Sequence, residues 1–147
     1  FNWVIKDELA VGSAPTKKEH LKFLENNGIK SVLSVCSNEE ADLSQLLNSI
    51  FYHTSIPLPD HTYKNKLNVK DLLNAVKAVS NLRKNGPVYV HCYAGIERSP
   101  IVCMAWLIRS KGLSPIESLD YLMNVNKGTN PLLEQFEVLK NPLLVQN

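Results

Sequence analysis

Two side chains of complementary chemistry, Cys92 and Arg98, lie within the short segment His-Cys-Tyr-Ala-Gly-Ile-Glu-Arg-Ser-Pro that begins at His91. A cysteine thiolate is a strong nucleophile, and an arginine guanidinium can bind two oxygens of a tetrahedral anion. The residues between them can curl so that successive backbone N–H groups point at the same anion, with Gly95 supplying a conformation that a Cβ would resist. The spacing therefore predicts a phosphate-binding loop built around a thiolate.

The chemistry expected of this loop is transfer of a phosphoryl group to sulfur. Attack of the Cys92 thiolate on phosphorus would give a phosphocysteine intermediate, which water then hydrolyses. The Ser99 hydroxyl can hydrogen-bond the sulfur as it becomes the leaving group in that second step, although capping the following helix is an alternative role. The residues expected to bind the substrate phosphate are Tyr93, Ala94, Gly95, Ile96, Glu97 and Arg98.

A strand before the loop and a helix after it would position these groups. The apolar run 88–90, bounded by a proline, is typical of a central strand buried on both faces, and the apolar stretch from Pro100 to Lys111 predicts a helix. Unpaired N–H groups and the dipole at a helix start favour an anion. The same groups would favour the thiolate form of Cys92.

Short apolar runs alternate with runs of helical periodicity along the rest of the chain. Strands are also expected over 3–5, 9–11, 31–36 and 51–56, and helices from Thr16 to Gly28, from Glu39 to about Asn48, from Val69 to about Asn85, from Ser114 onward and from Asn130 to about Lys140. Capping-box patterns begin two of these helices, at Thr16 and at Ser114. Such alternation predicts an α/β fold: one domain with a twisted, mostly parallel sheet of four or five strands flanked by helices. The phosphate-binding loop should lie at the carboxyl edge of that sheet.

The full pattern His-Cys-x5-Arg-Ser, with Gly95 three positions after the cysteine, resembles the signature of the protein tyrosine and dual-specificity phosphatases. The position of Cys92 in mid-chain argues against the low-molecular-weight phosphatases, whose loop lies at the N-terminus. The resemblance implies one dual-specificity-phosphatase-like catalytic domain over residues 1–147 that uses no cofactor. It also implies hydrolysis of phosphotyrosine, phosphoserine and phosphothreonine on proteins.

In that family the general acid is an aspartate on a separate loop, some thirty residues before the cysteine. Asp60 stands 32 residues before Cys92, so the resemblance implies that it is this acid. It would protonate the departing oxygen and then deprotonate the attacking water. An aspartate beside prolines can also simply shape a turn, and Asp42 and Asp71 are the rival candidates.

Two other functions remain open. The Asp60–His61 pair is similar to the lipid-directed tensin-type enzymes, which makes a phosphoinositide phosphatase the enzymatic alternative. The loops of those enzymes carry lysines, whereas Tyr93, Ile96 and the acidic Glu97 of this loop favour protein substrates over polyphosphorylated headgroups. A phosphate-binding module without turnover is the alternative from another class, and the presence of nucleophile, arginine and acid argues against it.

The remaining cysteines and histidines indicate no further chemistry. Three cysteines are too few for a disulfide framework and predict free thiols in a reducing, cytoplasmic compartment. Cys36 ends an expected strand parallel to the one that leads to Cys92, so it is either buried filler or a partner for a protective disulfide. Cys103 is expected in the core. No histidine stands at metal-ligand spacing, so no metal is expected.

Composition limits the partners. Charged residues make up 20% of the chain and the net charge is +2, which gives no basic field for nucleic acid. No apolar run reaches the length that a bilayer requires, and the first residues lack the pattern of a secretory signal, so no membrane insertion is expected. Phosphorylated proteins are the expected partners, and the residues specify no oligomeric state.

Overall fold

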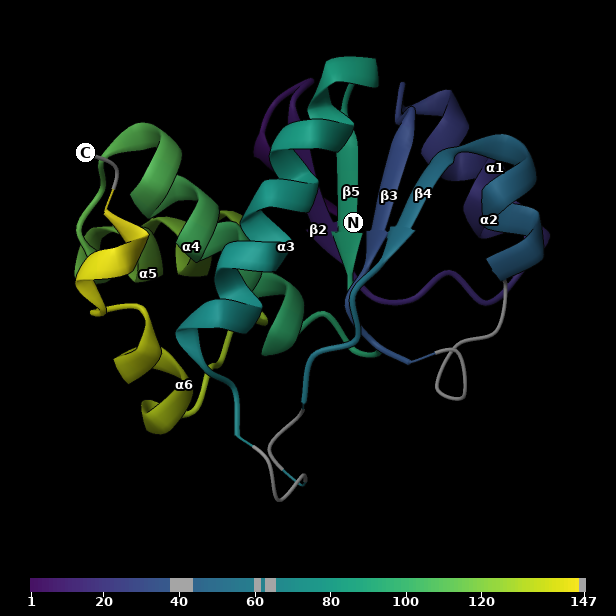
Figure 1. The fold of residues 1–147 in the computed structure, drawn as a ribbon. Helices are drawn as coiled ribbons and strands as arrows, with labels where there is room; N and C mark the ends of the chain where they lie inside the picture. The colour runs from purple at the N-terminus through teal and green to yellow at the C-terminus, as the bar shows by residue number, and fades with distance from the viewer. Residues whose placement is uncertain (38–43, 60–61, 63–65, 146–147) are drawn as a thin grey trace.

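A five-stranded sheet lies between two layers of helices (Figure 1). The computed structural model describes residues 1–37, 44–59, 62 and 66–145. The strands are β1 (Asn2–Ile5), β2 (Leu9–Gly12), β3 (Ser31–Ser34), β4 (Tyr52–Ser55) and β5 (Val88–His91), in the order β1-β2-β5-β3-β4. Only β1 pairs antiparallel, with β2; the other pairs are parallel. This confirms the predicted α/β class and the mostly parallel sheet.

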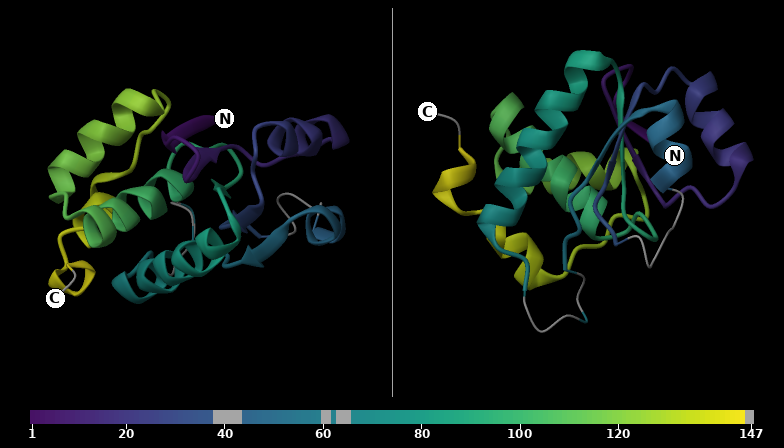
Figure 2. Two further views of the ribbon diagram at one scale, coloured as in Figure 1. Left: turned by 90° about the horizontal axis from the view of Figure 1, so that it is seen from above. Right: turned by 45° about the vertical axis from the view of Figure 1, so that its right-hand side comes forward.

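Helices cover both faces of the sheet. They are α1 (Lys18–Asn26), α2 (Ser44–Ile50), α3 (Val69–Leu82), α4 (Arg98–Lys111), α5 (Pro115–Val125) and α6 (Leu133–Val138), with 3-10 turns at Arg83–Asn85 and Pro142–Leu144. The two views of Figure 2 place α3, α4 and α5 on one side of the sheet and α1 and α2 on the other. No helix in the described ranges combines the length and apolarity needed to span a bilayer.

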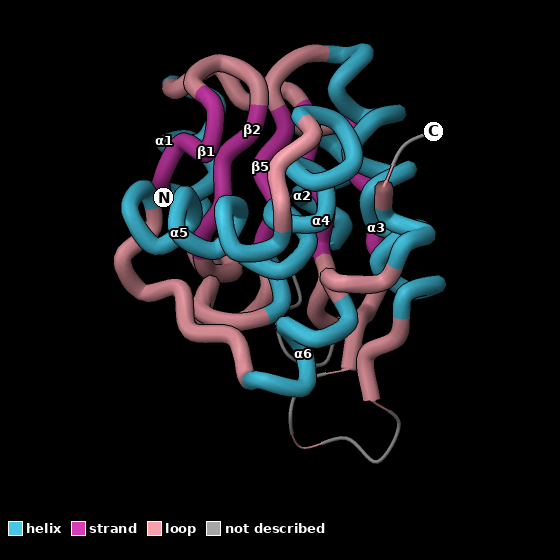
Figure 3. Tube along the Cα trace, turned by 90° about the vertical axis from the view of Figure 1, so that its left-hand side faces the viewer, coloured by secondary structure: helices cyan, strands magenta, loops and turns pink. Residues whose placement is uncertain are grey.

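The core consists of two apolar clusters separated by the sheet. Because successive side chains of a strand point to opposite faces, Val88 and Val90 pack in the larger cluster with α3 and α4, whereas Tyr89 packs in the smaller one with α1. Helix α4 lies between α5 and α3 (Figure 3) and packs on β2 and β5, and every residue from Arg98 to Ile108 is buried. Its apolar sequence follows from that position, since a helix covered on several sides has no polar face.

Several predicted element boundaries are confirmed. Ser114 caps α5 through a reciprocal capping box with Glu117, and a proline occupies the first turn. Gly28 follows the end of α1 with a φ of +86°, the left-handed conformation expected of a helix C-terminus. Strand β5 is buried throughout and has a neighbour on each side, as predicted for a central strand.

Other boundaries are wrong. No side chain caps α1, whose N-cap is Lys17; the backbone N–H of Thr16 instead donates to His20 Nδ1 at 3.0 Å, so the predicted capping box does not form. Helix α4 begins at Arg98, two residues before Pro100. A proline fits inside the first turn because N–H groups there have no intrahelical acceptor.

Two further helices differ from expectation. Helix α6 covers only Leu133–Val138 because the Gln135 side chain accepts a hydrogen bond from Leu132 N at 2.8 Å and thereby fixes a later start. Helix α2 extends to Ile50, past the expected end near Asn48. The first part of the predicted helix, residues 39–43, lies outside the described residues.

Leu122 and Ile116 provide a matched test of the packing, because both lie on α5. Leu122 is 0% exposed and Ile116 is 64% exposed. We expect Leu122→Ala to lower the free energy of unfolding by about 2–5 kcal/mol, since it leaves a cavity. Ile116→Ala should change it by less than about 0.5 kcal/mol. Urea denaturation followed by circular dichroism measures both, and equal effects would contradict the assigned face of α5.

Candidate active site

The 92–98 loop connects the end of β5 to the start of α4 and curls around the sulfur of Cys92. The Cys92 side chain is 2% exposed. Its Sγ accepts a hydrogen bond from the backbone N–H of Gly95 at 3.2 Å and lies 3.3 Å from Ser99 Oγ. The sulfur therefore lies on the concave side of the loop, where an N–H group and a hydroxyl converge on it.

Four carbonyl oxygens of this loop are held by donors outside it. The pairs are Cys92 O with His91 Nδ1 (3.1 Å), Tyr93 O with Ala14 N (3.0 Å), Gly95 O with Asn126 Nδ2 (3.2 Å) and Ile96 O with Asn130 N (2.9 Å). In a planar trans peptide the N–H of the next residue points opposite to the carbonyl. Carbonyls fixed on the outside therefore turn the N–H groups of residues 93, 94, 96 and 97 toward the inside.

The inner face of the loop is consequently made of backbone. The side chains of Tyr93, Ala94 and Ile96 are exposed to solvent. Convergent N–H groups at the start of a helix form a concave site with positive potential. Chemically, this arrangement can receive a tetrahedral anion directly above a sulfur nucleophile.

Gly95 allows the loop to close. Its φ is +75°, and a Cβ at this position would lie 2.7 Å from Gly12 C and 2.9 Å from Ser13 N. Both atoms belong to backbone at the end of β2, which cannot move aside as a flexible side chain could. The loop thus packs directly against the end of the neighbouring strand, and only glycine satisfies both the conformation and the space.

Arg98 and Ser99 lie in the first turn of α4. Arg98 is 5% exposed, and its Nη1 donates to Leu58 O at 3.4 Å. This contact brings the guanidinium against the segment that follows β4. The fully buried Ser99 directs Oγ toward both Cys92 Sγ and Gly12 O, the latter at 3.4 Å. The alternative reading of Ser99 as the helix cap is wrong, since the N-cap is Glu97.

His91 is buried and neutral at the end of β5. Burial lowers the pKa of its imidazole to about 4, against the weaker opposing effect of its contact with the Cys92 backbone. Its ring stacks on Tyr89 with centroids 6.0 Å apart. A buried, neutral imidazole at this position can orient the end of β5 without exchanging protons.

Of the three candidates for the general acid, Asp71 lies within the described residues. Asp60, its neighbour His61 and the rival Asp42 lie outside the described residues. Asp71 belongs to the capping box of α3, in which its carboxylate accepts from Asn68 N at 3.3 Å and its N–H donates to Asn68 Oδ1 at 2.9 Å. That contact gives Asp71 a structural role.

The other two cysteines are also buried, and neither forms a disulfide. Cys36 Sγ lies 3.9 Å from His91 Nδ1, at the end of the strand beside β5. Cys103 is in the core of α4, as predicted, and burial raises the pKa of its thiol. Cys36 is thus the thiol that contacts the residue preceding Cys92.

Sequence reasoning missed the donors that hold the loop from outside. Asn126 is the C-cap of α5; its buried amide donates to Gly95 O and to Thr129 Oγ1 at 2.9 Å, while its Oδ1 accepts from Asn2 Nδ2 at 2.8 Å. An asparagine at a helix end is common, so no local signal distinguishes this one. Ala14 follows β2, and its contact with the loop depends on the pairing of β2 with β5.

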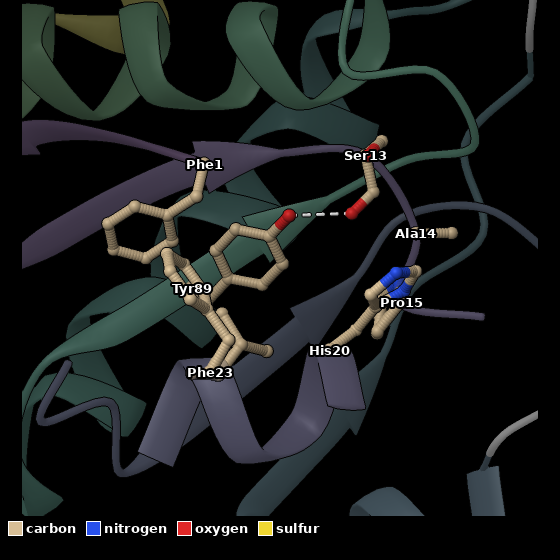
Figure 4. A pocket seen from close by; sticks show the side chains of 8 residues that line it. Phe1, Ser13, Ala14, Pro15, His20, Phe23 and Tyr89 are labelled. Atoms are coloured by element: carbon tan, nitrogen blue, oxygen red, sulfur yellow. Dashed lines mark hydrogen bonds between the residues drawn. The ribbon is translucent and has the colours of Figure 1, made fainter. Parts of the chain in front are cut away.

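A separate pocket of about 280 Å³ lies on the α1 face (Figure 4). Its walls come from the start of the chain, the turn after β2, α1 and β5: Phe1, Ser13, Ala14, Pro15, His20, Phe23, Leu24 and Tyr89. The Tyr89 hydroxyl donates to Ser13 O at 2.6 Å and so braces the turn that contacts the 92–98 loop. No residue of that loop lines the pocket, so it is distinct from the candidate active site.

A buried thiol enclosed by a strand-loop-helix turn at the carboxyl edge of a parallel sheet is the arrangement expected of a cysteine-based phosphatase. The family model described as "Dual specificity phosphatase, catalytic domain" matches residues 9–141. The chain therefore belongs to the dual specificity phosphatase family, within the cysteine-based protein tyrosine phosphatase superfamily.

Individual relatives agree with this assignment. Human "Dual specificity protein phosphatase 5" is 31% identical over 111 residues, which cover 75% of this chain and 27% of the relative. "Phosphatidylglycerophosphate phosphatase PTPMT2" of Arabidopsis thaliana is 24% identical over 152 residues, covering 97% of this chain and 66% of the relative. The solved structure "Tk-PTP in the active form" has a TM-score of 0.79 at 25% identity and covers 95% of this chain and 92% of its own. The chain thus spans from about a quarter to two thirds of these curated relatives.

Replacing Gly95 by alanine tests the closure of the loop. The added methyl group would force the loop away from the end of β2, so we expect phosphatase activity to fall by at least about 100-fold, the loss typical of misplaced catalytic donors. Gly112→Ala is the matched control, since Gly112 has a φ of +73° at the end of α4 but nothing within 4 Å of the added carbon. It should reduce stability by about 1 kcal/mol and leave activity within about twofold. Equal activity losses would contradict the packing argument.

Proposed function

We propose that this chain is the catalytic domain of a phosphatase that hydrolyses phosphotyrosine, phosphoserine and phosphothreonine on proteins through a phosphocysteine intermediate. The observation that carries the proposal is the position of Cys92 Sγ inside a loop whose carbonyls are held from outside. Family membership supports the same reaction class. Residues 93–98 would bind the phosphate, the backbone through N–H groups and Arg98 through its guanidinium.

In the first proposed step, the Cys92 thiolate attacks phosphorus and the bond from phosphorus to the ester oxygen breaks. Asp60 gives its proton to the departing oxygen, which leaves as tyrosine or as serine or threonine. The negative charge on the phosphoryl oxygens is stabilised by the inward N–H groups, the start of α4 and Arg98. Leu58 supports the acid assignment, because it contacts Arg98 and precedes Asp60 by two residues.

In the second proposed step, water attacks phosphorus and the phosphorus–sulfur bond breaks. Asp60 takes a proton from the water, and inorganic phosphate is released. Ser99 would donate a hydrogen bond to the sulfur as it regains its charge, which its 3.3 Å separation from Sγ allows. The reaction needs Cys92 as a thiol, and three cysteines outside any disulfide support a reducing, cytoplasmic setting for it.

A specific observation favours phospholipid substrates as the second candidate. Apolar side chains stand exposed on and beside the loop: Tyr93, Ile96, Leu132 and Leu133, the last at 75% exposure. The last two follow closely on Asn130, whose N–H bonds Ile96 O. An apolar rim can contact acyl chains as well as apolar residues of a protein. The Arabidopsis relative named a phosphatidylglycerophosphate phosphatase is consistent with this second candidate.

Hydrolysis of an aryl phosphate, phosphopeptides and phospholipid vesicles by wild type, Cys92→Ser and Arg98→Lys tests the proposal. Cys92→Ser should lose at least about 1,000-fold in kcat, and Arg98→Lys about 100-fold, because lysine cannot bind two oxygens in the same plane. Arg109→Lys on the exposed side of the same helix is the matched control and should stay within about twofold.

Other outcomes of that assay would favour one of the alternative functions. Activity that survives Cys92→Ser would refute the thiolate mechanism. An inactive wild type that still binds phosphopeptides would identify a binding module. Faster turnover of phospholipid vesicles than of any phosphopeptide would transfer the assignment to the second candidate.

The Asp60 assignment is tested separately with leaving groups of different quality. A general acid contributes about 100-fold or more when the leaving oxygen is a poor leaving group. Asp60→Asn should therefore slow phosphoserine and phosphothreonine peptides by about 100-fold and an activated aryl phosphate much less. Asp71→Asn keeps a carbonyl acceptor in the α3 capping box and serves as the control. Equal losses on all substrates would exclude Asp60 as the acid.

A further inference from the structure

A row of polar side chains crosses the sheet on the face covered by α1 and α2. His91 Nε2 lies 2.6 Å from Ser34 Oγ, Ser34 Oγ lies 2.8 Å from His53 Nε2, and His53 Nδ1 lies 2.8 Å from Asn48 Oδ1. The four residues come from β5, β3, β4 and α2. The row thus links an exposed helix to the histidine that holds the Cys92 carbonyl.

The direction of the hydrogen bonds in this row is fixed at its inner end. The Cys92 carbonyl can only accept, so His91 Nδ1 carries the proton that it donates. Since burial keeps His91 neutral, Nε2 has no proton and must accept. Ser34 therefore donates its hydroxyl proton to His91, and this leaves its oxygen as the acceptor for His53.

The same logic extends to the outer end. His53 must carry its proton on Nε2 to donate to Ser34. Burial also lowers the pKa of His53 and favours its neutral form, so Nδ1 is an acceptor. The Asn48 amide must then present its NH₂ group to Nδ1. The structure places Asn48 Oδ1 2.8 Å from the ring; because oxygen and nitrogen of an amide have nearly the same shape, the bond directions derived above imply that this amide is turned over.

We propose that Ser34 and His53 are positioning residues that fix the tautomer of His91 and thereby the orientation of the Cys92 carbonyl. With the opposite tautomer, a bare Nδ1 would face the lone pairs of that carbonyl. The peptide would turn, and the N–H of Tyr93 would leave the inner face of the loop. The inference rests on the proposed function in that the positioned group is its nucleophile.

The surroundings of His91 make this control necessary. Other titratable or charged groups near it in the described chain are Tyr89 from β5, Cys36 after β3, the Cys92 thiol and the Arg98 guanidinium from α4. Cys36 could donate weakly to an unprotonated Nδ1 across 3.9 Å and so stabilise the wrong tautomer. The hydroxyl of Ser34, at 2.6 Å from Nε2, outweighs that longer contact.

Packing on this face of the sheet does not require polar side chains. Ser34 pairs with His91 in the same register in which Val32 pairs with Tyr89, two residues earlier on the same face. That earlier row is part of the apolar cluster under α1. His53 of β4 is paired with Val32 and reaches diagonally to Ser34, so the polar contacts converge on the Ser34–His91 pair next to the 92–98 loop. Burying such groups carries a cost unless they are fully hydrogen-bonded.

The tautomers can be measured on the unmodified protein. Long-range ¹⁵N–¹H correlation spectra of histidine-labelled protein at neutral pH report which ring nitrogen carries the proton. We expect His91 protonated on Nδ1 and His53 on Nε2. A proton on Nε2 of His91 would overturn the proposal, and this measurement needs neither a variant nor a substrate.

Variants test the effect on the nucleophile. Ser34→Ala should lower kcat by about 10-fold, the equivalent of one buried hydrogen bond, with KM changed by less than about threefold. Alkylation of Cys92 by iodoacetate at neutral pH should also be slower than in wild type by up to about 10-fold, because the displaced Tyr93 N–H no longer favours the thiolate. His53→Leu should have a smaller effect of the same kind, because the Ser34 hydroxyl stays beside His91 Nε2 but can then either donate to it or accept from it.

Two controls separate positioning from simple stability. His53→Gln keeps an N–H donor and should restore both readouts to near wild type, whereas His20→Leu removes a histidine outside the row and should change neither. Reduced stability with an unchanged alkylation rate in Ser34→Ala would overturn the proposal. Because alkylation and tautomer are measured without substrate, they would stand even if no phosphoester were hydrolysed.

Discussion

The structure depends on one constraint, the outward anchoring of backbone carbonyls in the 92–98 loop. A peptide group has two poles, so any concave site that presents N–H groups inward must satisfy the carbonyls on its outer side. Here the donors are an imidazole, a side-chain amide and two backbone N–H groups. Without them the same residues could form a turn, but the turn would have no reason to present its N–H groups to an anion.

This requirement explains why distant parts of the chain meet at one edge of the sheet. The turn after β2 supplies Ala14, the end of α5 supplies Asn126, and the segment before α6 supplies Asn130. The order β1-β2-β5-β3-β4 places β5 between β2 and β3, so the loop that follows β5 is flanked on both sides. Helix α4 then returns along the sheet and is buried from Arg98 to Ile108, which fixes its first turn and with it Arg98 and Ser99.

The parts of the site that sequence could predict are those encoded locally. The strand Val88 to Val90, the curled loop and the helix after it follow from apolar runs, a glycine and a proline, and the fold class follows from the alternation of strands and helices. The donors around the loop could not be predicted, because Asn126 and Ala14 acquire their roles only through tertiary contacts. Helix starts were the weakest predictions for a related reason. Pro100 fits any position of a first turn, and the capping pattern at Thr16 lost to a bond with His20.

The positive charge around the 92–98 loop favours an anion on its concave side. A guanidinium that is almost wholly buried, at the positive end of a buried helix, favours a negative group in the adjacent concavity. The sulfur of Cys92 is the group that the loop itself can offer, and the Gly95 N–H already points at it. In the proposed reaction a phosphate dianion would satisfy the remaining inward N–H groups while the sulfur stays beneath it, so the features that stabilise the proposed nucleophile would also bind its target. On this proposal binding and activation are two consequences of one backbone conformation, and a change that reverses any peptide of the loop should impair both together.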